Sequence, residues 1–95
     1  MIRSILLIKF KPDSTEQQIE AFHRELEAVD YEGRRHFEFH RDLKLTDDAM
    51  DAMIIADFDD EAAYRGWVTC PGHLRVRGVF LDPIRGQRDR FLYEV

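Results

Sequence analysis

Polar and apolar residues alternate at the start of the chain, but apolar side chains fall on both sides of the alternation. In residues 2–10, an extended strand would place Leu6 and Ile8 on one face and Ile5 and Leu7 on the other. A strand with one wet face shows a clean alternation, whereas a strand covered on both faces does not. The pattern therefore predicts a central strand, and something must cover its second face.

A helix is predicted to follow this strand. Ser14, with Gln17 three residues later, fits a capping box, so the helix is expected to begin there. Gly33 is a suitable residue to end it. The helix would bury one apolar stripe, whose members recur at spacings of three and four: Ile19, Phe22, Leu26 and Val29.

Alternation returns in residues 35–43 and 50–58, which predicts two further strands joined by an acidic turn at 46–48. After the second of these, Asp59 is expected to cap a short helix. Asp60 and Glu61 would then lie in its first turn, where negative charge is favourable.

Pro71 must interrupt this helix, because proline restricts the residue before it and lacks a backbone donor. Residues 74–81 have apolar spacing for a second short helical segment that ends near Pro83. Residues 90–95 alternate again and predict the closing strand.

The resulting order is strand, helix, strand, strand, broken helix, strand, without repeat or linker. It predicts a single α+β domain over residues 1–95, with the ferredoxin-like split βαβ arrangement, a four-stranded antiparallel sheet and helices on one face. The other face would be bare and partly apolar. We expect a ligand or a second subunit to cover it, and two such sheets packed together would form a two-fold symmetric homodimer.

Composition narrows the possible partners. The net charge of -5 disfavours a nucleic-acid partner, which requires a large positive surface. No apolar run approaches the roughly 20 residues of a membrane span, and no membrane partner is expected. The apolar opening is too short for a secretory signal, so a cytoplasmic location is expected. Cys70 is the single cysteine, which excludes an intrachain disulfide. No cofactor-binding motif is present, and no cofactor is expected.

Charge is unevenly distributed along the chain. Residues 46–61 hold six Asp and one Glu without any Lys or Arg. The split is consistent with a charged contact between subunits or an anionic ligand, but solvated charged faces are the preferred interpretation. The wide spacing of the arginines favours pairing with the acidic stretch over binding of a carboxylate or phosphate. The arginines concerned come later in the chain: Arg75, Arg77, Arg85, Arg88 and Arg90.

Three potential metal ligands share one strand face. His36, Glu38 and His40 follow one another at spacings of two. Such neighbours lie roughly 6–7 Å apart, so a single metal would need unusual rotamers or a further ligand. A polar strand face or a hydrogen-bonded dimer contact is the favoured interpretation, and no metal is expected.

Four segments together resemble the stress-responsive dimeric α+β barrel (Dabb) family, in order over essentially the whole chain. They are MIRSILLIKFKP at 1–12, FEF at 37–39, FDDEA at 58–62 and CPGHL at 70–74. The resemblance implies a ferredoxin-like fold that pairs into a dimeric barrel. It does not settle function, because one fold hosts many activities.

Within that family, the chain shows a distant similarity to the plant polyketide cyclase olivetolic acid cyclase, in its Pro-x-His turn. That similarity implies a role for His73 in an aldol condensation. Ser4 stands where the cyclase has its first histidine, and Trp67 stands where it has a tyrosine. Serine is no base near neutral pH and indole offers only a donor, so this chemistry is not fully carried over.

His73 is the first catalytic candidate, because a proline-fixed turn would hold an imidazole that titrates near neutrality. His23, at the edge of the helical stripe, could reach the same cavity and replace the missing histidine. The alternatives are a packing histidine at a helix start and a boundary residue. The expected substrate-binding residues come from the first strand and from both helical regions: Ser4, Leu6, Ile8, Phe22, Leu26, Trp67 and Val68.

Three functional hypotheses remain open from the sequence. The first is a homodimer with a small hydrophobic pocket for a carbonyl or polyketide-like molecule, with His73 as a possible base in a cyclase- or lyase-like reaction. The second is a non-catalytic, stress-related dimerisation module. The third is a cofactor-free monooxygenase of the related dimeric-barrel type.

Overall fold

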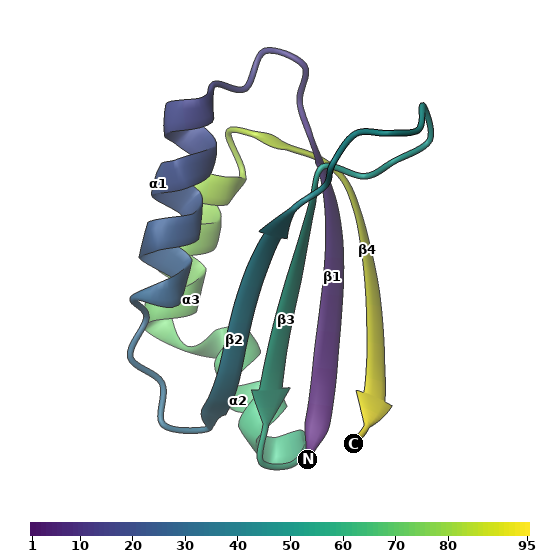
Figure 1. Cartoon of the computed structure of the whole chain (residues 1–95). Coiled ribbons are helices and arrows are strands. Elements are labelled where there is room, and N and C mark those ends of the chain that lie inside the picture. The colour runs from purple at the N-terminus through teal and green to yellow at the C-terminus, as the bar shows by residue number, and fades with distance from the viewer.

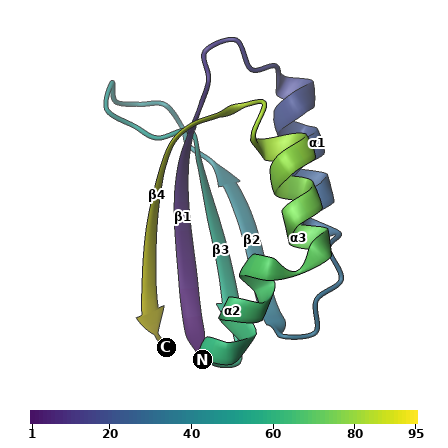
Figure 2. The same cartoon turned by 180° about the vertical axis from the view of Figure 1, so that it is seen from behind.

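A computed structural model describes all 95 residues of the chain. Four strands form one sheet, and the helices stand on one side of it (Figures 1 and 2). In chain order the elements are β1 (Ile2–Phe10), α1 (Glu16–Glu27), β2 (Arg34–Arg41), β3 (Ala52–Phe58), α2 (Glu61–Thr69), α3 (Pro71–Val76), the π-helical turn η1 (Arg77–Leu81) and β4 (Arg85–Glu94).

The strands lie in the order β2-β3-β1-β4, and every neighbouring pair is antiparallel. β1 is therefore flanked on both sides, as its two-sided apolar pattern predicts. The α+β, ferredoxin-like arrangement with helices on one face is confirmed. β4 forms the sheet edge farthest from α1. On the inner face of the sheet, which is the face that carries the helices, Figure 2 shows β4 less covered than β2 and β3.

The core lies between the sheet and the helices. Leu6 and Ile8 of β1 are buried there with Ile54 and Phe58 of β3. Helix α1 is amphipathic, and its buried residues are Ile19, Phe22 and Leu26, the first three members of the predicted stripe. The remaining buried apolar side chains extend this single cluster: Phe10, Ala52, Ala56, Trp67, Val76, Leu81 and Ile84.

Helix α1 begins one residue later than predicted. Thr15 is the N-cap and forms the capping box with Gln18, whereas the prediction was Ser14 with Gln17. Ser14 is occupied in the preceding turn, where its N–H donates to the Lys11 carbonyl and its hydroxyl donates to the Ile84 carbonyl. Two adjacent hydroxyl residues made the sequence ambiguous by one position.

The same helix ends at Glu27, well before Gly33, because an arginine supplies the C-terminal cap. Arg34 donates to the carbonyls of Leu26 and Glu27 in the last turn of the helix and to the carbonyl of Val29 just beyond it. Its guanidinium also lies over the rings of Phe37 and Trp67, at 4.7 and 5.0 Å from their centroids. Burial lowers the pKa of Arg34.

The broken helix is confirmed, with shifted bounds. Asp60 caps α2, and not Asp59, which accepts hydrogen bonds from Arg35 instead. Cys70 ends α2 and also caps α3, so the second segment starts at Pro71, three residues before the predicted position. Proline suits this first helical position because its missing N–H would have no partner there.

Strand β4 begins at Arg85, five residues before the predicted start. Its first half is polar, so it lacks the apolar alternation that reveals a strand, yet it pairs with β1 from Phe10 onward. The register shifts between Ile8 and Phe10. Gly86 fits this irregularity, because a Cβ at that position would lie 2.5 Å from the Lys9 carbonyl oxygen.

The outer face of the sheet is partly apolar and uncovered in one chain. In its middle row, Ile5 of β1 lies between Ile55 of β3 and Phe91 of β4. Phe91 is 65 % exposed. At one end of this face Arg3 donates two hydrogen bonds to Asp57 and lowers the pKa of that carboxyl. None of the helices has the length and apolar character that crossing a membrane requires.

Phe58→Ala tests the core assignment. Phe58 is 0 % exposed and packs against Tyr64 and Trp67, so its removal should lower the free energy of unfolding by about 3–5 kcal/mol. Urea denaturation followed by circular dichroism measures this loss. Val79→Ala, at an exposed position of η1, is the control and should change it by less than about 0.5 kcal/mol. Equal effects of the two substitutions would contradict the assignment.

Candidate functional site

His73 is held in a defined orientation where the helix breaks. Its backbone N–H donates to Cys70 Sγ at 3.4 Å, as part of the α3 cap. Its ring packs on Trp67 with 4.6 Å between centroids. Its Nδ1 lies 3.2 Å from the Val68 carbonyl oxygen. The predicted neighbours Trp67 and Val68 therefore touch His73 and position its ring.

The Val68 contact fixes the tautomer of His73. A carbonyl oxygen only accepts, so Nδ1 must carry the proton, and in the neutral ring Nε2 retains a free lone pair. The pKa of His73 is lowered by burial, which outweighs the opposing effect of the Val68 hydrogen bond, and the positive charges of Arg77, Arg90 and Arg88 lower it further. The neutral imidazole, whose Nε2 can accept a proton, is therefore the favoured form near neutral pH.

A small cavity lies beside His73, between the helical layer and the edge strand. Its volume of about 30 Å³ admits one or two waters or a small functional group. The lining is half apolar and half basic: Leu6, Phe22, Leu26 and Leu81 with His73, Arg77, Arg88 and Arg90. The cavity is thus neither the size nor the mostly apolar character expected for a polyketide pocket.

The remaining predicted strand residues lie close to this cavity. Ser4 is buried, and its hydroxyl accepts a hydrogen bond from Arg90 Nη1 at 2.7 Å. Ser4 thus holds the Arg90 side chain at the cavity edge. Ile8 is fully buried in the core opposite Arg88 and does not line the cavity. Of the expected substrate-binding residues, Leu6, Phe22 and Leu26 line it directly.

His23 lies elsewhere, and the prediction that it shares the cavity of His73 is wrong. Its ring stacks on Phe39 at 4.2 Å between centroids, and its Nε2 pairs with Glu27. One residue beyond Phe22 corresponds to a rotation of about 100° around the helix, which moves the side chain from the core to the surface over β2. The alternative of a boundary residue holds.

The predicted pairing between the late arginines and the acidic stretch is also wrong. Lys44, Arg3, Arg35 and Arg65 pair with the acidic residues of that stretch. Arg75 pairs with Glu25 and Arg85 lies near Asp82, whereas no carboxylate forms an ion pair with the remaining three. Those three, Arg77, Arg88 and Arg90, are the arginines that line the cavity.

The sequence grouped these three arginines and left an anionic ligand open, but their place beside His73 was not predicted, although a signal for it exists. Arg88 and Arg90 are two residues apart, so they share one face of a strand, and they lie opposite Ile8 and Leu6. A strand assigned from residue 85 would have placed both side chains on the inner face. Arg77 joins them from η1, whose wide turn is closed by the Asp82 N–H on the Arg77 carbonyl.

His36, Glu38 and His40 lie on the outer face of β2 and bind one another. The Glu38 carboxylate lies between both rings, with its oxygens 2.5 Å from His36 Nε2 and 2.8 Å from His40 Nε2. These contacts lower the pKa of Glu38. The three side chains thus form a hydrogen-bonded polar edge beside the apolar part of the outer face.

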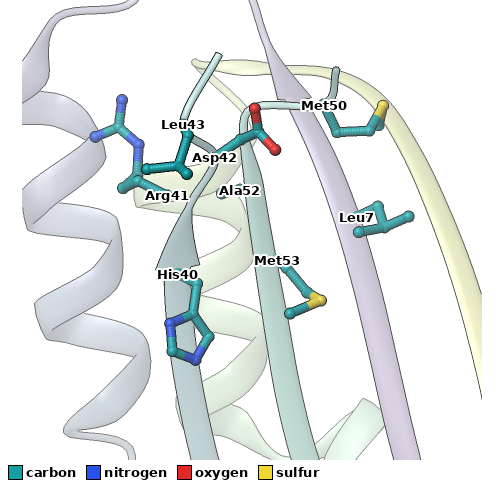
Figure 3. Close-up of a pocket in the computed structure, with 8 residues that line it drawn as sticks. All are labelled: Leu7, His40, Arg41, Asp42, Leu43, Met50, Ala52 and Met53. Atoms are coloured by element: carbon teal, nitrogen blue, oxygen red, sulfur yellow. The ribbon is translucent and has the colours of Figure 1, made fainter. Parts of the chain in front are cut away.

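A larger hollow lies on this outer face, near the loop between β2 and β3. Figure 3 shows Met53 and Leu7 projecting from neighbouring strands toward the same space, with Met50 above them. Its volume is about 260 Å³. Leu43, from the loop, also borders it and is 81 % exposed. The hollow is open, and the Nε2 of the imidazole that borders it, His40, is bonded to Glu38.

Solved structures of several known proteins share this fold. A dimeric ferredoxin-like protein of unknown function from Thermobifida fusca is 23 % identical, with a TM-score of 0.87 over 99 % of this chain and 90 % of that one. Hydroxynitrile lyase from Passiflora edulis is 16 % identical, with a TM-score of 0.82 over 97 % and 90 % of the two chains. An antibiotic biosynthesis monooxygenase is 16 % identical, with a TM-score of 0.80 over 100 % and 98 %.

At these identities the structural similarities establish the fold alone. The curated proteins compared with the chain include no match. The family comparison goes further, because residues 2–95 match the family described as Stress responsive A/B Barrel Domain, or Dabb. This match covers all of the secondary structure described above, and the chain belongs to the Dabb family.

Proposed function

We propose that this chain forms a homodimer through the outer face of its sheet, and that each subunit binds a small carbonyl compound beside His73. The observation that carries the binding site is the fixed imidazole, whose Nδ1–H is held by the Val68 carbonyl while its Nε2 keeps a lone pair. Proton abstraction next to the carbonyl is the reaction that this arrangement supports best.

The outer face has the composition of a subunit interface. Its centre is apolar across three strands, with Ile55, Ile5 and Phe91 in one row. The Arg3–Asp57 ion pair lies at one end of this apolar centre, and the polar edge of β2 lies along one side of it. An apolar centre with a polar rim is typical of interfaces, and an exposed patch of this kind is rare on a monomer.

A two-fold arrangement would also occupy the outer hollow. The loop between β2 and β3 projects beyond the sheet in Figure 1 and carries Leu43 and Leu45, which are 81 % and 82 % exposed. Packing against a second copy would bury these leucines together with Met53. The dimeric state described for the Thermobifida fusca protein supports this arrangement.

The inner site would act on a carbon next to a carbonyl group. His73 Nε2 would take the proton, so that the C–H bond breaks, an N–H bond forms and the electron pair moves onto the carbonyl oxygen as an enolate. The guanidinium groups of Arg88 and Arg90 would stabilise this negative charge. Returning the proton to the carbon restores neutral His73.

A second candidate function is a non-catalytic dimerisation module, in which His73 has only a packing role. The small volume of the cavity, about 30 Å³, is compatible with this function. The cofactor-free monooxygenase hypothesis has support only from the fold shared with an antibiotic biosynthesis monooxygenase. The carbonyl site and the dimerisation module therefore differ in whether His73 takes part in a reaction.

Phe91→Asp tests the dimer. Light scattering after size exclusion should give the wild-type protein twice the 11.3 kDa mass of the chain, and the variant should have the mass of one chain because a carboxylate would be buried in the interface. Val79→Asp introduces the same charge at an exposed residue of η1 and should leave the dimer intact. A monomeric wild-type protein at micromolar concentration would contradict the proposal.

The protonation state of His73 can be measured directly. Its imidazole should titrate below the ordinary value of 6.5 in an NMR pH series, and Arg88→Gln should raise the midpoint by removing one positive charge. Because the folded pKa is lowered, the stability contributed by neutral His73 is present above about pH 6.5 and is lost as pH falls through the folded pKa. A midpoint above 6.5 would argue against this environment.

His73→Gln tests the chemistry. In D2O, the wild-type protein should speed the incorporation of deuterium beside the ketone of levulinate, a small keto acid, and the variant should reduce this exchange to the buffer rate. Proton NMR measures the exchange, and His23→Gln, outside the cavity, is the matched control. If the wild-type and His73→Gln proteins exchange levulinate or neutral 2-pentanone equally, the non-catalytic candidate is favoured.

A further inference from the structure

We infer that the cavity beside His73 is an anion site that binds the carboxylate of a small organic acid, with Arg77, Arg88 and Arg90 as its recognition groups. The inference rests on the proposed function, because it names the class of ligand that the same site binds. It adds that the ligand must carry a negative charge, a point on which the family match says nothing.

Three guanidinium groups converge on the cavity from two elements. Arg88 and Arg90 come from neighbouring inward positions of β4, and Arg77 comes from the first residue of η1. The hydrogen bond from Arg90 to the buried Ser4 hydroxyl holds one of them in place. Arg88 and Arg90 are therefore anchored on a rigid strand and do not depend on a loop.

None of these three guanidinium groups forms an ion pair within the chain, and Asp82 lies 4.0 Å from Arg85. The pKa of Arg88 is lowered by burial and by the positive charges of Arg85, Arg90 and Arg77, which the negative charge of Asp82 only partly opposes. An anion in the cavity would relieve this mutual repulsion.

The local charge is opposite to that of the whole chain. The protein carries a formal charge of -5, and four arginines on α2, β1 and β2 pair with carboxylates: Arg3, Arg35, Arg41 and Arg65. A basic cavity in an acidic protein is the electrostatic pattern of a site that selects an anionic ligand. Three of the five arginines that form no ion pair, Arg77, Arg88 and Arg90, lie together at this cavity.

Size and shape favour a carboxylate. The volume of about 30 Å³ accepts a small planar head group, while the rest of the ligand would extend toward the less covered inner side of β4. A guanidinium binds a planar carboxylate through two parallel hydrogen bonds. Leu6 and Leu81 would contact the adjacent carbon atoms.

An NMR titration of the labelled dimer tests this inference. Levulinate and its uncharged analogue levulinamide differ in the carboxylate and keep the same ketone. Levulinate should shift the amide signals of His73 and Arg88 saturably, and levulinamide should bind at least about tenfold more weakly. Arg88→Gln should weaken levulinate binding by roughly tenfold or more, which corresponds to one lost charged hydrogen bond.

Arg65→Gln is the matched control, because it removes the same charge from an exposed ion pair on α2 and should change the affinity by less than about twofold. Equal binding of levulinate and levulinamide would overturn the anion site and leave the proposed carbonyl site standing. Shifts with neither compound would overturn both. Tighter binding of inorganic phosphate than of levulinate would overturn the carboxylate assignment.

The oligomeric state of the Arg88→Gln variant distinguishes an anion site from a role of Arg88 in the subunit interface. If Arg88→Gln dissociates the dimer and leaves the levulinate titration unchanged, the arginines serve the subunit interface and the inference is wrong. If the variant remains dimeric and loses affinity, the interface explanation is excluded and the anion site is supported.

Discussion

The structure depends on a single strand that must be buried on both faces. β1 pairs with β3 on one side and β4 on the other, so its backbone donors and acceptors are satisfied within the sheet. Its even-numbered side chains anchor the core under the helices, and its odd-numbered ones form the centre of the uncovered face. The helices protect only one of these faces, and the burial of the other requires a second surface.

The same strand connects the core to the candidate site. Ser4 and Leu6 are consecutive inward positions of β1, and each lies opposite a β4 residue, Leu92 and Arg90 respectively. Because α1, α3 and η1 leave the edge strand less covered, polar groups of β4 can reach the inner side without being sealed in the core. A cavity with a half-apolar and half-basic lining is the consequence.

Much of the fold could be predicted from residue patterns, because periodicity reflects which face is buried. The stripe of α1, the two-sided β1 and the break at Pro71 were all visible in the sequence. The first half of β4 was not, since its residues pair through the backbone while their side chains are charged. Helix bounds moved by one residue where two capping residues stand side by side, as at Thr15, and the C-terminal cap by Arg34 depends on tertiary contacts that no local pattern encodes.

The site was predicted only in part for a similar reason. His73 could be singled out because proline fixes the turn before it, but the arginines around it become neighbours only when η1 and β4 pack together. His23 was misplaced because it lies at the edge of the helical stripe. One residue along a helix rotates the side chain by about 100°, so the pattern alone does not decide whether such a residue points to the core or to the surface.

Arg34 has one more consequence for the molecule. It caps α1, lies over Phe37 of β2 and also lies over Trp67, the ring on which His73 rests. Unwinding of the last turn of α1 would deprive this guanidinium of its acceptors and loosen the support of the imidazole at the same moment. Arg34 therefore links the end of α1 to the ring that supports His73, although the two segments are separated by more than forty residues of sequence.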